Sequence, residues 1–421
     1  MKLHRPVAEQ IILAIKSIFG ATPEGKRYYA DKVIERLFKN NRKLGARDRR
    51  FIAESTYGIV RWWRLLRTAL AHADYSAMPS DLELWQIFGA WLIRQGAELP
   101  PWSELRELKP EVIRQAFDRA AREPQVKESV PDWLYELGLR ELGDVRWHKC
   151  LHSLNQTAPV VLRVNRLKST PEELREELAR EDIDTDLAPD DNGHLPDGLV
   201  LRERKNVFSS ESFKLGLFEV QDGASQKVAP LLDVKAGHRV IDGCAGAGGK
   251  TLHLAALMGN KGKIIAMDVH QVKLDELRRR AARDGVDCAE TRLIESAKTI
   301  KRLEKSADRV LLDVPCSGLG VVRRNPDAKW KLTPEDLPRL HALQAEILGE
   351  YSAMLKPGGK LVYATCSILP SENLAQVEAF LTKQGDAWKL LQVHQLWPGE
   401  PARDGFEGYD GFFAAVLERV H

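Results

Sequence analysis

The sequence lacks the features that mark several large classes of protein. Its 5 cysteines form no pair with zinc-finger spacing, and an odd number suits a reducing compartment better than a disulfide framework. Its opening apolar run, residues 11–15, is too short to cross a membrane, and Glu9 and Lys16 give that stretch an amphipathic pattern unlike a signal peptide. Internal repeats and low-complexity segments are also missing. We therefore expect a cytoplasmic protein with no membrane partner and no metal.

Length and charge narrow the architecture further. A chain of 421 residues exceeds one ordinary core, so two or three domains are expected.

Charge is nearly balanced, with 63 Lys plus Arg against 60 Asp plus Glu, but cations are in excess between Lys26 and Arg50. That run contains Arg42, Lys43, Arg47, Arg49 and Arg50. It is either an ordinary solvated face or a surface that binds nucleic-acid phosphates. Trp62 and Trp63 follow it, and because they are adjacent at least one should face a helix core.

The spacing of apolar residues changes twice along the chain. Residues 1–125 keep the spacing of amphipathic helices. Residues 126–225 mix a helix at 131–142, a strand at 160–164, a helix opened by Thr170 and further short β-like runs, which predicts a small α+β module. From residue 226 to 421 strands and helices alternate, which predicts a parallel sheet with helices on both faces, a doubly wound α/β domain.

The strands of the last region end in acids or hydroxyl residues. The candidates are Arg239–Asp242, Lys263–Asp268, 309–313 and 360–365, with an apolar closing strand at 412–417. We expect a long helix to start at Thr333 and Pro334, and the sequence Pro357-Gly358-Gly359 to end it. In a doubly wound sheet ligands bind at the carboxyl ends of the strands, so these ends predict the site.

A glycine-rich stretch, Val-Ile-Asp-Gly-Cys-Ala-Gly-Ala-Gly-Gly-Lys-Thr from Val240 to Thr251, is typical of a strand, a tight turn and a helix. A Walker phosphate loop would need its first glycine at position 244, where Cys244 stands. A dinucleotide or adenosyl cofactor instead needs an acid about 20 residues further on, and Asp268 meets that need. An ordinary strand-to-helix turn stays open as the alternative.

Two further strand ends carry cysteine. One reads Asp313-Val314-Pro315-Cys316-Ser317-Gly318 and the other Thr365-Cys366-Ser367. A lone cysteine at a strand end is more often a small apolar filler than a nucleophile. Two of them at neighbouring ligand-facing ends, beside an adenosyl-type loop, favour the nucleophile, because a thiolate reacts strongly when its pKa is lowered.

These residues together resemble the RNA 5-cytosine methyltransferases, and among them the bacterial RsmB/Sun branch. The most specific marks are the two cysteine motifs and the stretch 244–251; residues 219–226 and 323–330 extend the likeness. The helical start, with residues 48–52 and 57–61, resembles the antitermination-factor-like RNA-binding domain of that branch. The resemblance implies an RNA-binding helical domain at 1–125, an RNA-binding α+β module at 126–225 and a Rossmann-like class I methyltransferase domain at 226–421. We expect the chain to act as a monomer.

The resemblance also implies S-adenosylmethionine as the methyl donor. Asp268 would hold its ribose, Glu295 would lie near its adenine, and Asp313 would lie between cofactor and base. The methionine and ribose portion would lie against Cys244, Ala245, Gly246, Ala247, Gly248, Gly249 and Lys250. Two departures from the family pattern are Ala247, where many members have proline, and Glu295, where aspartate is usual.

The implied chemistry explains the two thiols. Carbon 5 of cytosine is a poor nucleophile until a thiolate adds to carbon 6, and the resemblance assigns that addition to Cys366. Cys316 would assist the elimination that frees the product, and Asp313 would hydrogen-bond the base. DNA cytosine methyltransferases use the earlier Pro-Cys as nucleophile, so the presence of both cysteines favours RNA. The target base must leave its stack to react.

We therefore expect methylation of small-subunit ribosomal RNA. The same reaction on transfer RNA is the alternative within the enzyme class. A non-catalytic RNA-binding ribosome-assembly factor is the alternative outside it, and the intact Cys316 and Cys366 argue against that reading. A nucleotide hydrolase is weakened by Cys244 in the Walker frame.

Overall fold

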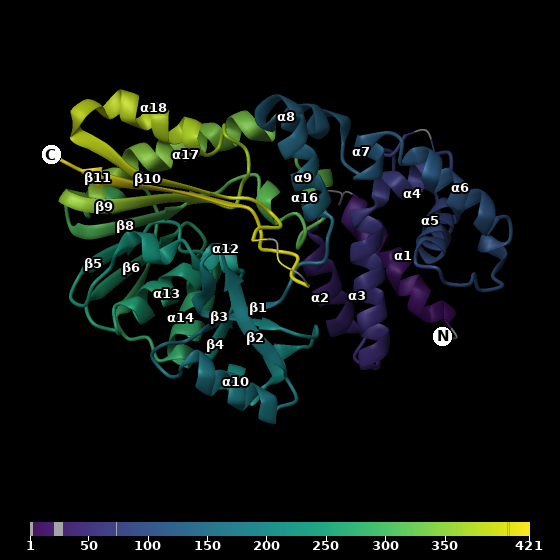
Figure 1. Ribbon diagram of the computed structural model, residues 1–421, viewed down its shortest axis with the longest axis horizontal. Helices are drawn as coiled ribbons and strands as arrows, with labels where there is room; N and C mark the ends of the chain where they lie inside the picture. The colour runs from purple at the N-terminus through teal and green to yellow at the C-terminus, as the bar shows by residue number, and fades with distance from the viewer. Residues whose placement is uncertain (1–2, 21–27, 73, 402, 404) are drawn as a thin grey trace. The chain divides into compact units, whose positions relative to one another are not determined.

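The computed structural model describes residues 3–20, 28–72, 74–401, 403 and 405–421 (Figure 1). The chain forms two compact units, Met1–Asn155 with Val322–Pro334, and Gln156–Val321 with Glu335–His421. The predicted boundary at residue 126 lies inside the first unit, and the three-domain division remains a prediction. Within the described ranges, every helix is too short or too polar to span a bilayer.

The first unit is helical, as the spacing of its apolar residues predicts. Its α-helices are α1 (Arg5–Phe19), α2 (Ala30–Asn40), α3 (Ala46–Arg61), α4 (Trp63–Ala69), α5 (Asp81–Arg94), α6 (Pro110–Ala120), α7 (Pro124–Lys127), α8 (Asp132–Leu142), α9 (Asp144–Leu154) and α16 (Ala328–Lys331). Ser80 and Glu83 form a capping box at the start of α5. Trp63 is 2% exposed and stacks on Phe19 with ring centroids 3.9 Å apart, which confirms that one of the adjacent tryptophans faces the core.

The short segment Val322–Pro334 is built into this helical unit although it follows the rest of the unit by a long stretch of chain. Asp327 accepts a hydrogen bond from the Ala30 N–H at 3.0 Å, and the Trp330 indole donates to the Val60 carbonyl at 2.7 Å. Lys329 is 1% exposed, and burial lowers its pKa well below the usual value. The unit is therefore discontinuous in sequence.

The second unit begins with the strands of the predicted α+β module, whereas the helix predicted at 131–142 belongs to the first unit as α8. Its antiparallel sheet has the order β2-β3-β1-β4, formed by β1 (Val161–Val164), β2 (Thr185–Asp190), β3 (Gly193–Leu201) and β4 (Phe218–Val220). Helix α10 (Pro171–Arg180) begins with a Thr170–Glu173 capping box, and α11 (Glu211–Lys214) precedes β4. Strand β2 was not predicted, because its acids and Pro189 are poor strand formers and its pairing shifts register there.

The larger sheet has seven strands in the order β10-β11-β9-β8-β5-β6-β7. They are β5 (Arg239–Asp242), β6 (Lys263–Asp268), β7 (Ala289–Leu293), β8 (Ala307–Asp313), β9 (Leu355–Thr365), β10 (Trp388–Leu396) and β11 (Phe412–Arg419). The neighbouring helices are α12 (Gly223–Gln226), α13 (Gly249–Leu257), α14 (Gln271–Asp284), α15 (Ala297–Lys301), α17 (Asp336–Tyr351) and α18 (Leu374–Gln384). Figure 1 shows α13 and α14 on one side of this sheet and α17 and α18 on the other.

Alternate residues of each central strand explain the two layers of helices. Val240 and Ile264 pack into one buried cluster with residues of α13 and α14, whereas Ile241 and Ile265 pack into another with residues of α15, α17 and α18. A strand that is apolar on both faces needs cover on both. The predicted doubly wound α/β class is therefore confirmed.

Three details of the prediction were wrong. The sheet is mixed, because β11 runs antiparallel to both β9 and β10. The long helix begins at Asp336, so Thr333 does not cap it, and it ends at Tyr351. The Pro357-Gly358-Gly359 sequence lies within β9, where pairing with β8 shifts register and Gly358 has φ of +75°, so it bulges a strand.

Candidate active site

The glycine-rich turn connects β5 to α13 as predicted. Gly246 and Gly248 have φ angles of +55° and +91°, which side-chain-bearing residues rarely adopt. A Cβ at Gly248 would also lie 2.5 Å from Cγ of Leu277, so α14 leaves room only for glycine there. Helix α13 starts at the next residue, with its first backbone N–H groups available to a ligand.

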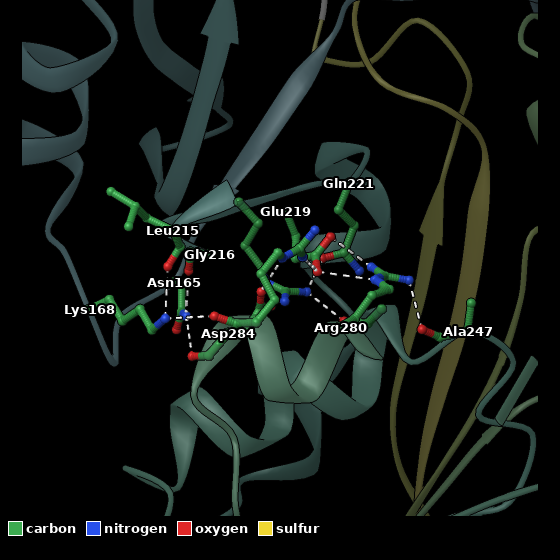
Figure 2. Close-up of polar contacts among 12 residues, drawn as sticks. Asn165, Lys168, Leu215, Gly216, Glu219, Gln221, Ala247, Arg280 and Asp284 are labelled. Carbon is green, nitrogen blue, oxygen red and sulfur yellow. Dashed lines mark hydrogen bonds and ion pairs between the residues drawn. The ribbon is translucent and has the colours of Figure 1, made fainter. Parts of the chain in front are cut away.

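Two arginines hold the carbonyl groups of this turn. Arg280 of α14 donates to the Ala247 carbonyl at 2.7 Å and binds Glu219 with both Nε and Nη2, as Figure 2 shows. Arg163 of β1 donates to the Gly249 carbonyl at 2.6 Å and to the Gln221 side chain. Burial lowers the pKa of Arg163 to about 10. One residue of the small module and one residue of α14 therefore both hold the turn.

The polar network continues from Glu219 to the end of α14 (Figure 2). Asn165 donates to the Gly216 and Asp284 carbonyls, both at 2.8 Å. Burial and then the charge of the neighbouring Glu219 raise the pKa of the Asp284 carboxyl to about 7. Burial alone would raise the pKa of Glu219, but Arg280 and Arg283 of α14 lower it below its usual value. The network joins the small antiparallel sheet to the helix that supports the glycine turn.

Asp268 lies at the carboxyl end of β6, against the glycine turn. Its Oδ2 accepts the Gly246 N–H at 3.0 Å, and its Oδ1 accepts the His270 N–H at 2.8 Å. Each carboxylate oxygen keeps a lone pair for a further donor. Glu295 follows the neighbouring β7 and is exposed, one residue after Ile294, whose N–H donates to the Asp268 carbonyl.

A partly buried ion pair lies next to the turn. The Lys250 ammonium, in the first turn of α13, lies 2.5 Å from Oδ2 of Asp313 at the end of β8. Lys250 is 8% exposed and its ammonium lies 5.0 Å from the centre of the Phe412 ring. The neighbouring Asp242 accepts the Thr251 hydroxyl at 2.7 Å, and burial raises the pKa of Asp242 to about 7.

These groups enclose a cavity of about 210 Å³. It is lined by Val220, Gln221, Ser225, Asp242, Cys244, Ala245, Gly249, Lys250, Arg280 and Asp313. The Oδ1 atom of Asp242 is buried with no hydrogen-bond partner in the structure as described, so a ligand donor would be stabilised there. Residues 244, 245, 249, 250 and 313 of the predicted site line this cavity. The other predicted site residues do not: Gly246, Ala247, Gly248, Asp268, Glu295, Cys316 and Cys366.

The two cysteines at the ends of β8 and β9 meet. Their sulfur atoms are 3.3 Å apart, and the Gly320 N–H donates to the Cys366 carbonyl at 2.9 Å, which holds the two loops together. The Cys366 sulfur, burial and the charge of Glu372 raise the pKa of Cys316 well above its usual value. Parallel pairing of β8 with β9 brings both thiols to the edge of the sheet where Asp313 lies.

Sequence reasoning missed Arg163, Arg280, Asp242 and Glu372. The first two bind backbone carbonyls, which leave no residue-type signal in a sequence. Asp242 was read only as the end of a strand. Glu372 follows the second cysteine motif and lies outside it.

The cationic run of the helical unit divides into two groups. Arg42, Lys43 and Arg47 are exposed, and we refer to them as the basic turn. Arg49 instead donates to the Leu44 and Asn41 carbonyls, at 3.0 and 3.3 Å, and so stabilises the connection between α2 and α3. Arg50 pairs with Glu54. Lys26, where the predicted run begins, lies outside the described residues.

Known proteins are similar to this chain in sequence and in fold. Residues 229–418 match the family model of the 16S rRNA methyltransferase RsmB/F, and residues 130–208 match that of the RsmF/B-like ferredoxin-like domain. A probable ribosomal RNA small subunit methyltransferase B of Synechocystis sp. is 32% identical over 405 residues, covering 89% of this chain and 87% of that protein. Ribosomal RNA small subunit methyltransferase B of Vibrio cholerae is 37% identical, over 69% of this chain and 65% of that one.

A solved structure is similar as well. The crystal structure of a methyltransferase homologue from Pyrococcus horikoshii superposes with a TM-score of 0.58 and 28% identity, covering 70% of this chain and 97% of that one.

Proposed function

The chain belongs to the RsmB/F family of S-adenosylmethionine-dependent 16S rRNA cytosine-5 methyltransferases, and from that premise we propose that it methylates carbon 5 of a cytosine in 16S ribosomal RNA through a covalent bond to Cys366. The observation that carries the proposal is the pair of thiols 3.3 Å apart at neighbouring strand ends. Asp313 of the Lys250–Asp313 ion pair ends β8, the strand that leads into the loop with Cys316. A protein that only bound RNA would have no need of two such thiols next to a cofactor turn.

The residues present fit S-adenosylmethionine, which supplies an electrophilic methyl group on a sulfonium. The buried, unpartnered Oδ1 of Asp242 suits the ammonium of its methionine portion. The turn from Cys244 to Lys250 lets the cofactor approach the backbone closely. Asp268 would accept the ribose hydroxyls, and Glu295 would lie on the adenine side.

The chemistry assigned to the chain has two stages. The Cys366 thiolate adds to carbon 6 of cytosine, and the electron pair gained at carbon 5 takes the methyl group as its bond to the sulfonium breaks. Asp313, held by Lys250, hydrogen-bonds the base and favours that addition. Removal of the carbon 5 proton, assisted by Cys316, then restores the double bond and expels the Cys366 thiolate.

The other parts of the chain support RNA as the substrate. The basic turn suits phosphate contacts, so we assign RNA binding to residues 1–125. We also assign RNA binding to the α+β module at 126–225 and catalysis to residues 226–421. A ribosomal substrate would place the enzyme in the cytoplasm, where we propose that it acts as a monomer.

The test offers the purified protein S-adenosylmethionine with a 16S transcript, with small ribosomal subunits or with transfer RNA, and locates the product by bisulfite sequencing. We expect a methylated cytosine in a small-subunit substrate. Cys366→Ala should abolish transfer while leaving cofactor affinity nearly unchanged, as measured by calorimetry. Methylation of transfer RNA alone would show that 16S ribosomal RNA is not the substrate. Full turnover by Cys366→Ala would show that Cys366 is not the nucleophile.

A further inference from the structure

A buried carboxylate accepts hydrogen bonds from both of the loops that carry the cysteines, the loop after β8 and the loop after β9. Glu372, between β9 and α18, is 0% exposed. Ser317 donates its N–H to Oε1 at 2.7 Å and its hydroxyl to Oε2 at 2.5 Å. Ser367 donates its hydroxyl to the same Oε2, and Gln344 of α17 donates to Oε1 at 3.0 Å. The two serines each directly follow one of the cysteines, so one carboxylate joins the two loops.

The four donors to Glu372 are uncharged groups. Among the ion pairs of the described residues none includes Glu372, so its charge is balanced only by hydrogen bonds. An ionised carboxylate only accepts hydrogen bonds, and four donors on two oxygens suit that form. Burying a charge without a cationic partner is costly. A serine or an amide would tie the loops without that cost, which points to a use for the charge itself.

The charge of Glu372 acts on the Cys316 thiol. The Cys366 sulfur, burial and then the Glu372 charge raise the pKa of Cys316, against a smaller opposing effect of the Gly318 N–H. Two thiols 3.3 Å apart interact strongly, so ionising one disfavours ionising the other. The thiol whose surroundings disfavour the thiolate more is the one that keeps its proton.

We propose that Glu372 is a positioning residue that fixes the two cysteine loops against each other and whose charge leaves the proton on Cys316 and the thiolate on Cys366. This deepens the proposed function and rests on its assignment of Cys366 as the nucleophile. Once Cys366 is bonded to carbon 6 it carries no charge, so one effect that held the proton on Cys316 is gone. Cys316 then releases its proton to water more easily and can accept the one on carbon 5.

Three substitutions separate the charge of Glu372 from its reach. Glu372→Gln keeps the size and removes the charge, Glu372→Asp keeps the charge and shortens the reach, and Glu378→Gln makes the same change at an exposed position of α18. Alkylation of each cysteine by iodoacetamide, followed by peptide mapping across the pH range in which thiols ionise, reports the thiolate without needing RNA.

With Glu372→Gln we expect the pH midpoint for Cys316 alkylation to fall and kcat to fall at least about tenfold, with KM for S-adenosylmethionine unchanged. Glu372→Asp should lower kcat and leave the midpoint near that of the wild type, and Glu378→Gln should change neither. An unchanged Cys316 midpoint in a folded Glu372→Gln protein would overturn the role of the charge.

If Glu372→Gln does not fold, Ser317→Ala and Ser367→Ala test the same tie. Each removes one donor and leaves the carboxylate, so each should lower kcat with the alkylation midpoint unchanged. Wild-type kcat in both would overturn the proposal. A wild-type protein that methylates no RNA would reject the proposed function instead, while the alkylation of Cys316 still judges Glu372.

Discussion

Asp268→Ala probes the cofactor site most directly, because the carboxylate has two functions that different measurements separate. In the protein without ligand it accepts the Gly246 and His270 N–H groups, at 3.0 and 2.8 Å. In the proposed complex its remaining lone pairs accept the ribose hydroxyls. Only the second function differs between free and bound protein, so only it should change cofactor affinity.

The expected magnitudes follow from that division. Losing a charge-assisted hydrogen bond to the ribose should cost about 1.5–3 kcal/mol, which weakens S-adenosylmethionine binding roughly ten- to 150-fold. Losing the acceptor of two backbone N–H groups should lower the thermal midpoint of unfolding, because Asp268 is 7% exposed and water replaces it poorly. RNA affinity should stay close to that of the wild type.

Calorimetric titration with S-adenosylmethionine measures the affinity, and differential scanning calorimetry measures the unfolding. Asp268→Asn is the matched variant: its one carbonyl oxygen still accepts, but its amide cannot accept the second N–H, so both effects should be smaller. A cofactor dissociation constant unchanged by Asp268→Ala, with a lowered thermal midpoint, would show that the carboxylate only supports the turn and that the ribose lies elsewhere.

Three further outcomes are expected. Cys316→Ala should methylate once and then stall, leaving a protein–RNA adduct on a denaturing gel, and removal of Cys366 as well should eliminate the adduct; a single mutant that turns over normally would make Cys316 structural. Neutralising the basic turn should weaken RNA binding and reduce its salt slope by up to about 3, whereas Arg49→Ala should chiefly lower thermal stability; an unchanged salt slope would make the basic turn an ordinary solvated face. The folded-state pKa of Asp284 is raised to about 7, so the stability that comes from its protonated form is complete below the unfolded pKa of about 4 and is lost as pH rises through 7. Asp284→Asn should therefore flatten the dependence of the unfolding free energy on pH between these values. An equal pH dependence in both proteins would contradict the raised pKa of Asp284.

The sequence was most informative where one stretch of chain carries its own physical constraint. The glycines between β5 and α13 predicted the turn because positive φ angles exclude other residues. Residue types at strand ends predicted that Cys316 and Cys366 would come together, because parallel strands place their carboxyl ends together.

What escaped prediction depends on contacts between distant segments. Arg163 and the Gly249 carbonyl are 86 residues apart, and nothing in either stretch indicates the pair. The edge strand β10 mixes exposed polar and apolar residues, so its pattern resembles a loop. The Pro-Gly-Gly sequence is as suitable for a bulge as for a helix stop, and only the pairing of β9 with β8 decides between them.

The discontinuity of the helical unit constrains how the protein reaches its folded state. When the first 155 residues leave the ribosome, Asp327, Lys329 and Trp330 have not been made, so the Ala30 N–H and the Val60 carbonyl lack their final partners. The unit can be completed only after Gln156–Val321 has been synthesised, which makes a contact of long sequence separation a late step in folding. An N-terminal fragment that ends at Asn155 should therefore unfold at a lower temperature than the same helices in the full chain, and adding a peptide of residues 322–334 should raise that temperature.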